Sequence, residues 1–217
     1  MGALGGGAEV AGARRSRLDR RGGWCALLVG LVLAPALEAS AHVGQGDAAS
    51  GFSAGFLHPL SGLDHLLAML AVGMWGAQLG MPALWVLPVA FPVVMALGGV
   101  AGILGAPLPA SEAAIVLSVV LLGTAIALGG RPPVWVAAAL VSFFAIFHGY
   151  AHGRELPAQA SALPFCAGFV LATGCIHLSG IGIGFVTKLP HGEAALRAGG
   201  AAIGLAGLLL AWQLSAG

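Results

Sequence analysis

The chain has 217 residues, of which 59% are hydrophobic and only 8% are charged, and its formal net charge is +1. Its mean hydropathy of +0.97 excludes a soluble globular domain, which needs more polar surface than this composition supplies. Only four basic residues lie beyond residue 41, and they form no patch, which excludes nucleic-acid binding. We therefore expect a protein whose solvent is the lipid bilayer.

The first 41 residues have the pattern of a secretory signal peptide. Five arginines within residues 14–21 precede an apolar run from Trp24 to Leu37, and three small residues end the segment at Ala41. Because the apolar run is short for a membrane span, we predict cleavage after Ala41. His42 then becomes the N-terminus. An uncleaved signal anchor, which would add one helix, is the alternative.

Six apolar segments follow, each long enough to cross a hydrocarbon core of about 30 Å as a helix. They lie at about 55–79, 83–105, 111–129, 132–151, 162–186 and 194–214. Glycine and proline residues separate them. The predicted fold is therefore all-α, with a cleavable signal peptide (residues 1–41) and one polytopic bundle of six transmembrane helices (residues 42–217).

The basic residues suggest the orientation of the six spans. With His42 outside the cytoplasm, six crossings return the C-terminus to the same outer side. Arg131, Lys188 and Arg197 then lie at cytoplasmic connections, whereas only Arg154 lies outside. This distribution agrees with the positive-inside rule.

Two short runs carry ionisable residues in or beside the apolar segments. Such groups are costly at membrane depth and mark a functional site by default, and imidazole with carboxylate is a ligand set for divalent metals. The alternative is that they form buried ion pairs and hydrogen bonds that fix helix register. The residues are His58, Asp64 and His65 in the first run and His148, His152 and Glu155 in the second.

Helical spacing places the members of each run on a common face. If the first span is one continuous helix, His58 and His65 stand about two turns apart on one face, with Asp64 close to it. The residues of the second run are spaced by four and then three positions, which predicts one stripe. Both runs lie toward the outer ends of their spans, so we expect them at the same depth.

Three further residues extend the predicted metal site. Glu112 begins the third span on the same outer side, where it is available to complete the site or to neutralise the charge of the ion. His42, if freed by cleavage, adds an amine and an imidazole. His177 lies nearer the cytoplasm in the fifth span, and it is either a hydrogen-bonded packing residue or a relay site for the ion.

The two runs resemble the signatures of a known family. The segment from His58 to Gly73 resembles the first signature of the HupE/UreJ family, and the segment from Phe147 to Glu155 is similar to the second. The resemblance covers essentially the whole chain. It implies a nickel or cobalt permease associated with hydrogenase and urease maturation, with the six residues of the two runs as motif positions and Glu112 as a further acidic residue of the family type.

What the resemblance implies is uptake of a divalent metal, with Ni²⁺ as the transported ion. We expect this uptake across the inner membrane of a bacterium, where signal cleavage and six crossings place both mature termini in the periplasm. Imidazoles and carboxylates replace part of the water shell without binding so tightly that release fails. The same donors accept Co²⁺, Zn²⁺ and Cu²⁺. A link to hydrogenase or urease maturation proteins is expected, and homo-oligomer formation is left open.

The residues alone leave two other functions open. An intramembrane zinc hydrolase would hold Zn²⁺ with three His/Asp ligands and attack its substrate with a metal-bound water. A metal sensor or delivery protein would bind the ion without moving it. A polar path past His177 would favour transport, whereas a closed, water-filled pocket with an open fourth ligand position would favour the hydrolase.

Overall fold

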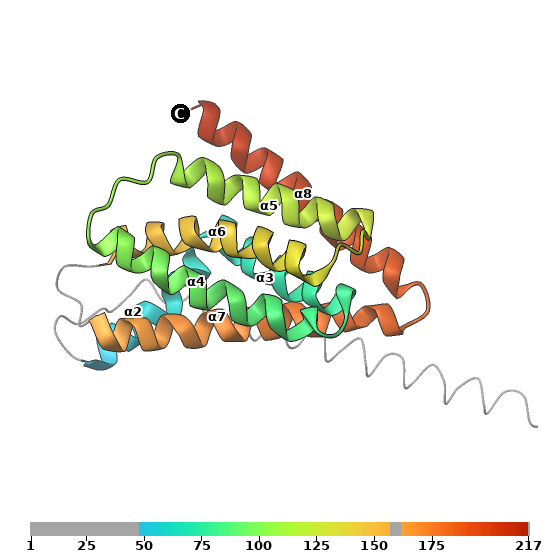
Figure 1. Ribbon diagram of the computed structural model, residues 1–217, viewed down its shortest axis with the longest axis horizontal. Helices are drawn as coiled ribbons and strands as arrows, with labels where there is room; N and C mark the ends of the chain where they lie inside the picture. Colours follow the sequence, from blue (N-terminus) through green and yellow to red (C-terminus); the bar gives the residue numbers. More distant parts are fainter. Residues whose placement is uncertain (1–47, 157–161, 217) are drawn as a thin grey trace, which may run out of the picture. The chain divides into compact units, whose positions relative to one another are not determined.

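A computed structural model describes residues 48–156 and 162–216, so the predicted signal peptide and His42 lie outside the described residues. The regular structure of the described part is entirely helical, which confirms the all-α prediction for it (Figure 1). The helices are α2 Ala48–Ser61, α3 Leu63–Leu79, α4 Ala83–Ile103, α5 Ser111–Leu128, α6 Val134–Arg154, α7 Ala162–Gly184, the short 3₁₀ helix η2 Phe185–Lys188, and α8 Gly192–Ala216.

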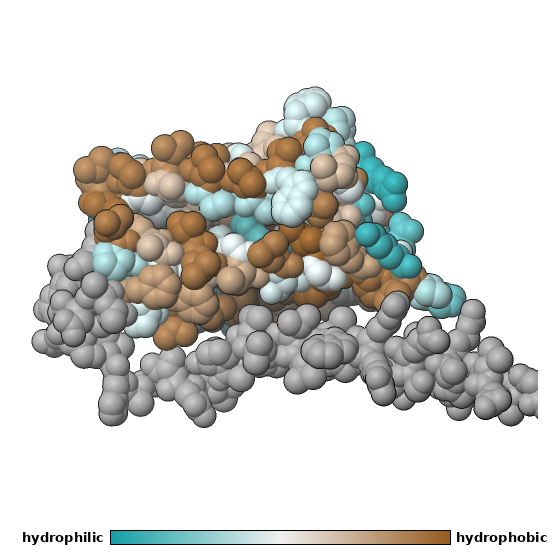
Figure 2. Space-filling view, turned by 90° about the horizontal axis from the view of Figure 1, so that it is seen from below, coloured by the Kyte–Doolittle hydropathy of each residue, from teal (hydrophilic) through white to brown (hydrophobic). Residues whose placement is uncertain are grey.

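The helices have the length and composition of membrane spans. Among the described residues, five helices are long and apolar enough to cross a membrane, and α2 with α3 makes a sixth span if the bent pair is counted as one. Large apolar side chains, including Val89, Leu97 and Leu209, are exposed on the helices. Figure 2 shows hydrophobic residues over much of one face, with hydrophilic residues gathered toward one end. The chain is therefore a multi-pass membrane protein.

The expectation of one continuous helix over residues 55–79 is wrong. α2 and α3 are bent by 82° relative to each other, and Gly62 between them is extended, with φ −97° and ψ 116°. Pro59 weakens the end of α2 because it has no N–H for the helical ladder. The Ser61 hydroxyl donates to the carbonyl oxygen of His58 over 2.6 Å, which satisfies an acceptor that a helix end leaves unpaired. His58 and His65 therefore lie on two different helices.

The remaining helices pack in close pairs. α4 lies against α6, α5 against α8, and α7 against both α2 and α3 (Figure 1). The α4–α6 contact requires glycine, because a Cβ atom on Gly149 would overlap the carbonyl oxygen of Met95 and one on Gly98 would overlap that of Ile146. Small residues let helix backbones approach closely in membranes. This contact holds the C-terminal half of α6, with its two histidines, in the bundle.

Candidate metal-binding site

Residues of both predicted runs, all except His148, line one cavity of about 300 Å³ beside the bend between α2 and α3. α5 and α6 supply the rest of the wall. The lining residues are His58, Ser61, Gly62, Asp64, His65, Glu112, Ile115, Ala151, His152 and Glu155. The bend thus brings the first run opposite the second, although the two lie far apart in the sequence.

His58, His152 and Glu155 form the outer part of the site, which we call the outer trio. One ligand atom from each residue lies within 4.8 Å of the other two, and Nε2 of His58 lies 3.1 Å from Oε2 of Glu155. The Glu155 side chain is 55% exposed, whereas those of His58 and His152 are 22% and 8% exposed. Two imidazoles and a carboxylate at this spacing are a donor set for a divalent cation.

α6 carries three of the candidate ligands on one side. It ends at Arg154, three residues later than the sequence predicted, and Glu155 follows in helical backbone conformation with its N–H bonded to the carbonyl oxygen of Ala151. The spacing of four and then three positions therefore places His148, His152 and Glu155 along one side of the helix.

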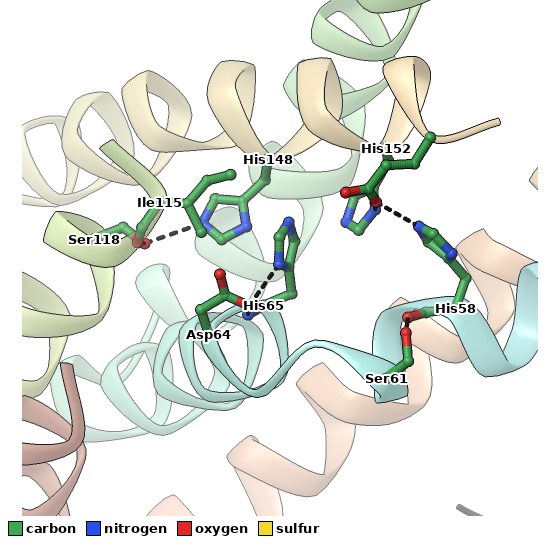
Figure 3. Close-up of polar contacts among 9 residues, drawn as sticks. His58, Ser61, Asp64, His65, Ile115, Ser118, His148 and His152 are labelled. Atoms are coloured by element: carbon green, nitrogen blue, oxygen red, sulfur yellow. Dashed lines mark hydrogen bonds and ion pairs between the residues drawn. The ribbon is translucent and has the colours of Figure 1, made fainter. Parts of the chain in front are cut away.

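His65, His148 and His152 form a deeper group, which we call the inner trio. The ring centroids of His65 and His148 are 4.8 Å apart, and those of His65 and His152 are 4.3 Å apart. Figure 3 shows the three rings side by side, with His58 beyond His152. All three residues are buried, and His148 is completely so. Because His152 belongs to both trios, the outer and inner groups are continuous.

The inner trio contains ring nitrogens that are buried without a hydrogen-bond partner in the described part of the chain. These are Nε2 of His65, Nδ1 of His148 and both ring nitrogens of His152. A buried polar atom without a partner costs roughly 1–3 kcal/mol, so such atoms mark a place where a ligand can bind. Neutral imidazole nitrogen is a common metal ligand, so these nitrogens are further candidate ligands behind the outer trio, which is the group in the described part of the chain whose ligand atoms lie close enough together to hold one ion.

Asp64 orients His65. Its Oδ1 atom accepts hydrogen bonds from the backbone N–H and the ring Nδ1–H of His65, each over 2.8 Å. With Nδ1 engaged in this way, Nε2 carries the free lone pair. A carboxylate bonded to the far nitrogen of an imidazole is the usual support of a histidine metal ligand. Asp64 thus supports the site through His65 and also contributes negative charge to the cavity wall.

The remaining predicted residues take different places. Glu112 lies in the first turn of α5, is exposed and lines the cavity. His177 is buried in α7 and does not line the cavity. The ring of Phe91 contacts the rings of both His148 and His177, with centroid distances of 5.3 Å and 5.5 Å. His177 is therefore one aromatic side chain away from the inner trio.

Sequence reasoning missed Phe91 and Ser118. Phe91 is one apolar residue among many in α4, so no local signal distinguishes it. Ser118 does have a signal, because it is a polar residue within an apolar span. Its hydroxyl lies 3.0 Å from Nε2 of His148 and donates to the carbonyl oxygen of Ile115 over 2.6 Å (Figure 3).

Comparison with known proteins gives a consistent result. The family model described as HupE / UreJ protein matches residues 27–210. Protein HupE of Rhizobium leguminosarum bv. viciae is 46% identical over 175 residues, which are 81% of this chain and 92% of that protein. No solved structure matches the chain.

Proposed function

Since the chain belongs to the HupE/UreJ family, we propose that it is a permease that carries Ni²⁺ across the bacterial inner membrane. Transport is facilitated or channel-like, and the outer trio captures the ion at the periplasmic side. One observation carries the proposal: imidazole and carboxylate donors from separate helices meet in a cavity, beside buried imidazole nitrogens that have no hydrogen-bond partner among the described residues. Donors that run from an exposed carboxylate to buried imidazoles suit stepwise removal of water from an ion.

The arrangement supplies a sequence of ligand exchanges. Glu155 is the most exposed donor and His148 the most buried, with His58 and His152 between them. An ion held by the outer trio can reach the inner trio while it keeps His152 as a ligand. Exchange between neighbouring weak sites, rather than one tight site, is what allows an ion both to enter and to leave. His177, beyond Phe91, is the next donor along this direction.

The donor set favours nickel over the lighter divalent ions. Nitrogen-rich ligation suits Ni²⁺, whereas Mg²⁺ prefers oxygen ligands and retains its water. Asp64, Glu112 and Glu155 offset the charge of the ion while it is partly desolvated. Co²⁺, Zn²⁺ and Cu²⁺ accept the same ligands, so they are the competitors against which selectivity is measured.

The charge distribution supports an orientation in which the cavity faces the periplasm. The connection after α5 carries Arg131, and the region between α7 and α8 carries Lys188, with Arg197 in the first turns of α8. Helices that alternate in direction place these residues at the end of the bundle opposite the cavity. The positive-inside rule assigns that end to the cytoplasm, where the ion would serve hydrogenase or urease maturation.

Uptake of radioactive nickel into proteoliposomes tests the proposal. The intact protein should accumulate nickel, and His58→Ala and His152→Ala should each reduce the initial rate at least tenfold at matched protein levels. His191→Asn is the control, because His191 is exposed and lies outside the cavity, at the start of α8. Equal uptake by the intact protein and both cavity variants would show that nickel transport does not depend on the cavity.

A second measurement separates transport from hydrolysis. Metal content of the purified protein and of the proteoliposome lumen is determined in the same preparations. Absence of nickel uptake together with one tightly bound Zn²⁺ per chain would overturn the permease and favour a zinc hydrolase. Lumenal nickel that depends on the outer trio supports the permease.

A further inference from the structure

Ser118 is a hydroxyl residue placed against the deepest ligand of the site. It lies in α5 and is completely buried. Its Oγ atom lies 2.6 Å from the carbonyl oxygen of Ile115 and 3.0 Å from Nε2 of His148. α5 supplies no other side chain that hydrogen-bonds a histidine among the described residues, so this contact joins α5 to the inner trio.

The two contacts of Ser118 decide which nitrogen of His148 carries the hydrogen. A carbonyl oxygen only accepts, so the single hydroxyl hydrogen of Ser118 is donated to Ile115. The Ser118 oxygen must then accept from His148, which requires a hydrogen on Nε2. In a neutral imidazole the other nitrogen, Nδ1, is left with its lone pair. Nδ1 of His148 is the buried atom that has no partner in the described part of the chain.

We propose that Ser118 is a positioning residue of the metal path, which holds His148 in the form that presents Nδ1 to the inner trio. This inference rests on the proposed function, because it assumes that the ligand of the trio is a divalent metal ion. Without the hydroxyl, His148 can place its hydrogen on either nitrogen and can rotate. Part of the population then presents N–H, which cannot coordinate a cation.

Asp64 and Ser118 support their histidines through opposite ring nitrogens. Asp64 supports His65 through Nδ1 and leaves Nε2 for the ion, whereas Ser118 supports His148 through Nε2 and leaves Nδ1. A carboxylate support raises the basicity of the imidazole more than a neutral hydroxyl does. His65 is therefore the stronger ligand and His148 the weaker one, which favours onward release from the deep end of the trio.

The test is a double-mutant cycle on nickel binding by the purified full-length protein in detergent. All proteins carry His58→Ala, which breaks the outer trio and leaves the inner trio intact. Nickel affinity is measured by titration calorimetry for this background alone, with Ser118→Ala, with His148→Ala, and with both. The control is Ser179→Ala, since the Ser179 hydroxyl donates to the carbonyl oxygen of Cys175 in its own helix.

We expect Ser118→Ala to weaken nickel binding about tenfold when His148 is present, which is the lower end of the usual cost of losing such a support. It should change the affinity less than about twofold when His148 is already alanine, because the two residues act as one unit. Ser179→Ala should have no effect. Equal weakening with and without His148, or no weakening in either, would overturn the proposal.

The tautomer of His148 keeps the inference testable if Ser118→Ala does not fold. In the metal-free protein, ¹⁵N NMR of the imidazole should show the hydrogen of His148 on Nε2, because the Ser118 oxygen accepts from that nitrogen. A hydrogen on Nδ1 would contradict the inference. Binding is measured without transport, so absence of uptake by the intact chain would overturn the proposed permease and leave this result standing.

Discussion

Nε2 of His58 and Oε2 of Glu155 lie 3.1 Å apart although the two residues are separated by 97 positions in the chain. The pair joins α2 to the end of α6 at the exposed side of the cavity. His152, one turn before Glu155, completes the group that could hold a metal ion. Tertiary structure therefore brings the histidine of α2 to the His152–Glu155 pair at the end of α6.

Glu155→Gln should weaken nickel capture with little change in the fold. The amide keeps the size of the side chain but removes the negative charge that attracts and holds the cation. We expect the KM for nickel uptake to rise about tenfold, within the range found when a supporting or ligating group is lost. Glu193→Gln in the first turn of α8, outside the cavity, is the matched control, and a KM that rises equally in both variants would refute a specific role for Glu155.

Gly62→Ala should disturb the support of His65. An added Cβ atom would lie 3.0 Å from Oδ1 of Asp64 and 3.1 Å from Nδ1 of His65, so this hydrogen-bonded pair must shift. Because small displacements of ligands are costly, we expect nickel affinity to fall several-fold by titration calorimetry. Gly130→Ala, where an added Cβ meets none of the described residues within 4 Å, should bind nickel as the intact protein does. Unchanged affinity in Gly62→Ala would contradict the prediction.

Gly149→Ala should destabilise the bundle itself. Its new methyl group would overlap the carbonyl oxygen of Met95, and overpacking of this kind costs about 1–3 kcal/mol. We expect a lower thermal unfolding midpoint in detergent, together with weaker nickel binding because His148 and His152 flank this position. Gly174→Ala is the control, because an added Cβ there meets no neighbouring element within 4 Å in the described part of the chain, and it should leave the unfolding midpoint unchanged. An equal fall of the midpoint in the two variants would argue against the Gly149–Met95 contact.

His177→Asn should separate transport from binding. His177 lies beyond Phe91 and outside the cavity, so nickel affinity of the purified protein should stay within about twofold. The initial uptake rate should fall about tenfold if His177 is the next donor on the path, an effect comparable to loss of a metal ligand. His191→Asn is the control, because asparagine tolerates the φ of 60° at that position. Wild-type uptake in His177→Asn would exclude a relay role.

Much of the site could be anticipated from the sequence because the cost of burying charge makes ionisable residues in apolar helices conspicuous. His58, Asp64, His65, His152, Glu155 and Glu112 all line the cavity, and His148 lies directly behind it. Ser118 was overlooked because a buried serine can bond to its own helix, and only the position of α6 shows that its oxygen also meets a histidine.

Apolar length and composition, which are properties of single segments, were sufficient to establish a helical membrane protein and to single out its ionisable residues. Which of those residues meet was decided by the 82° bend at Gly62 and by the glycine contact between α4 and α6. Helical periodicity describes neighbours along one helix only. The bend places His58 and His65 on different helices, and the packing of α6 brings a histidine to each of them, so the two continuous groups of donors exist only in the folded bundle.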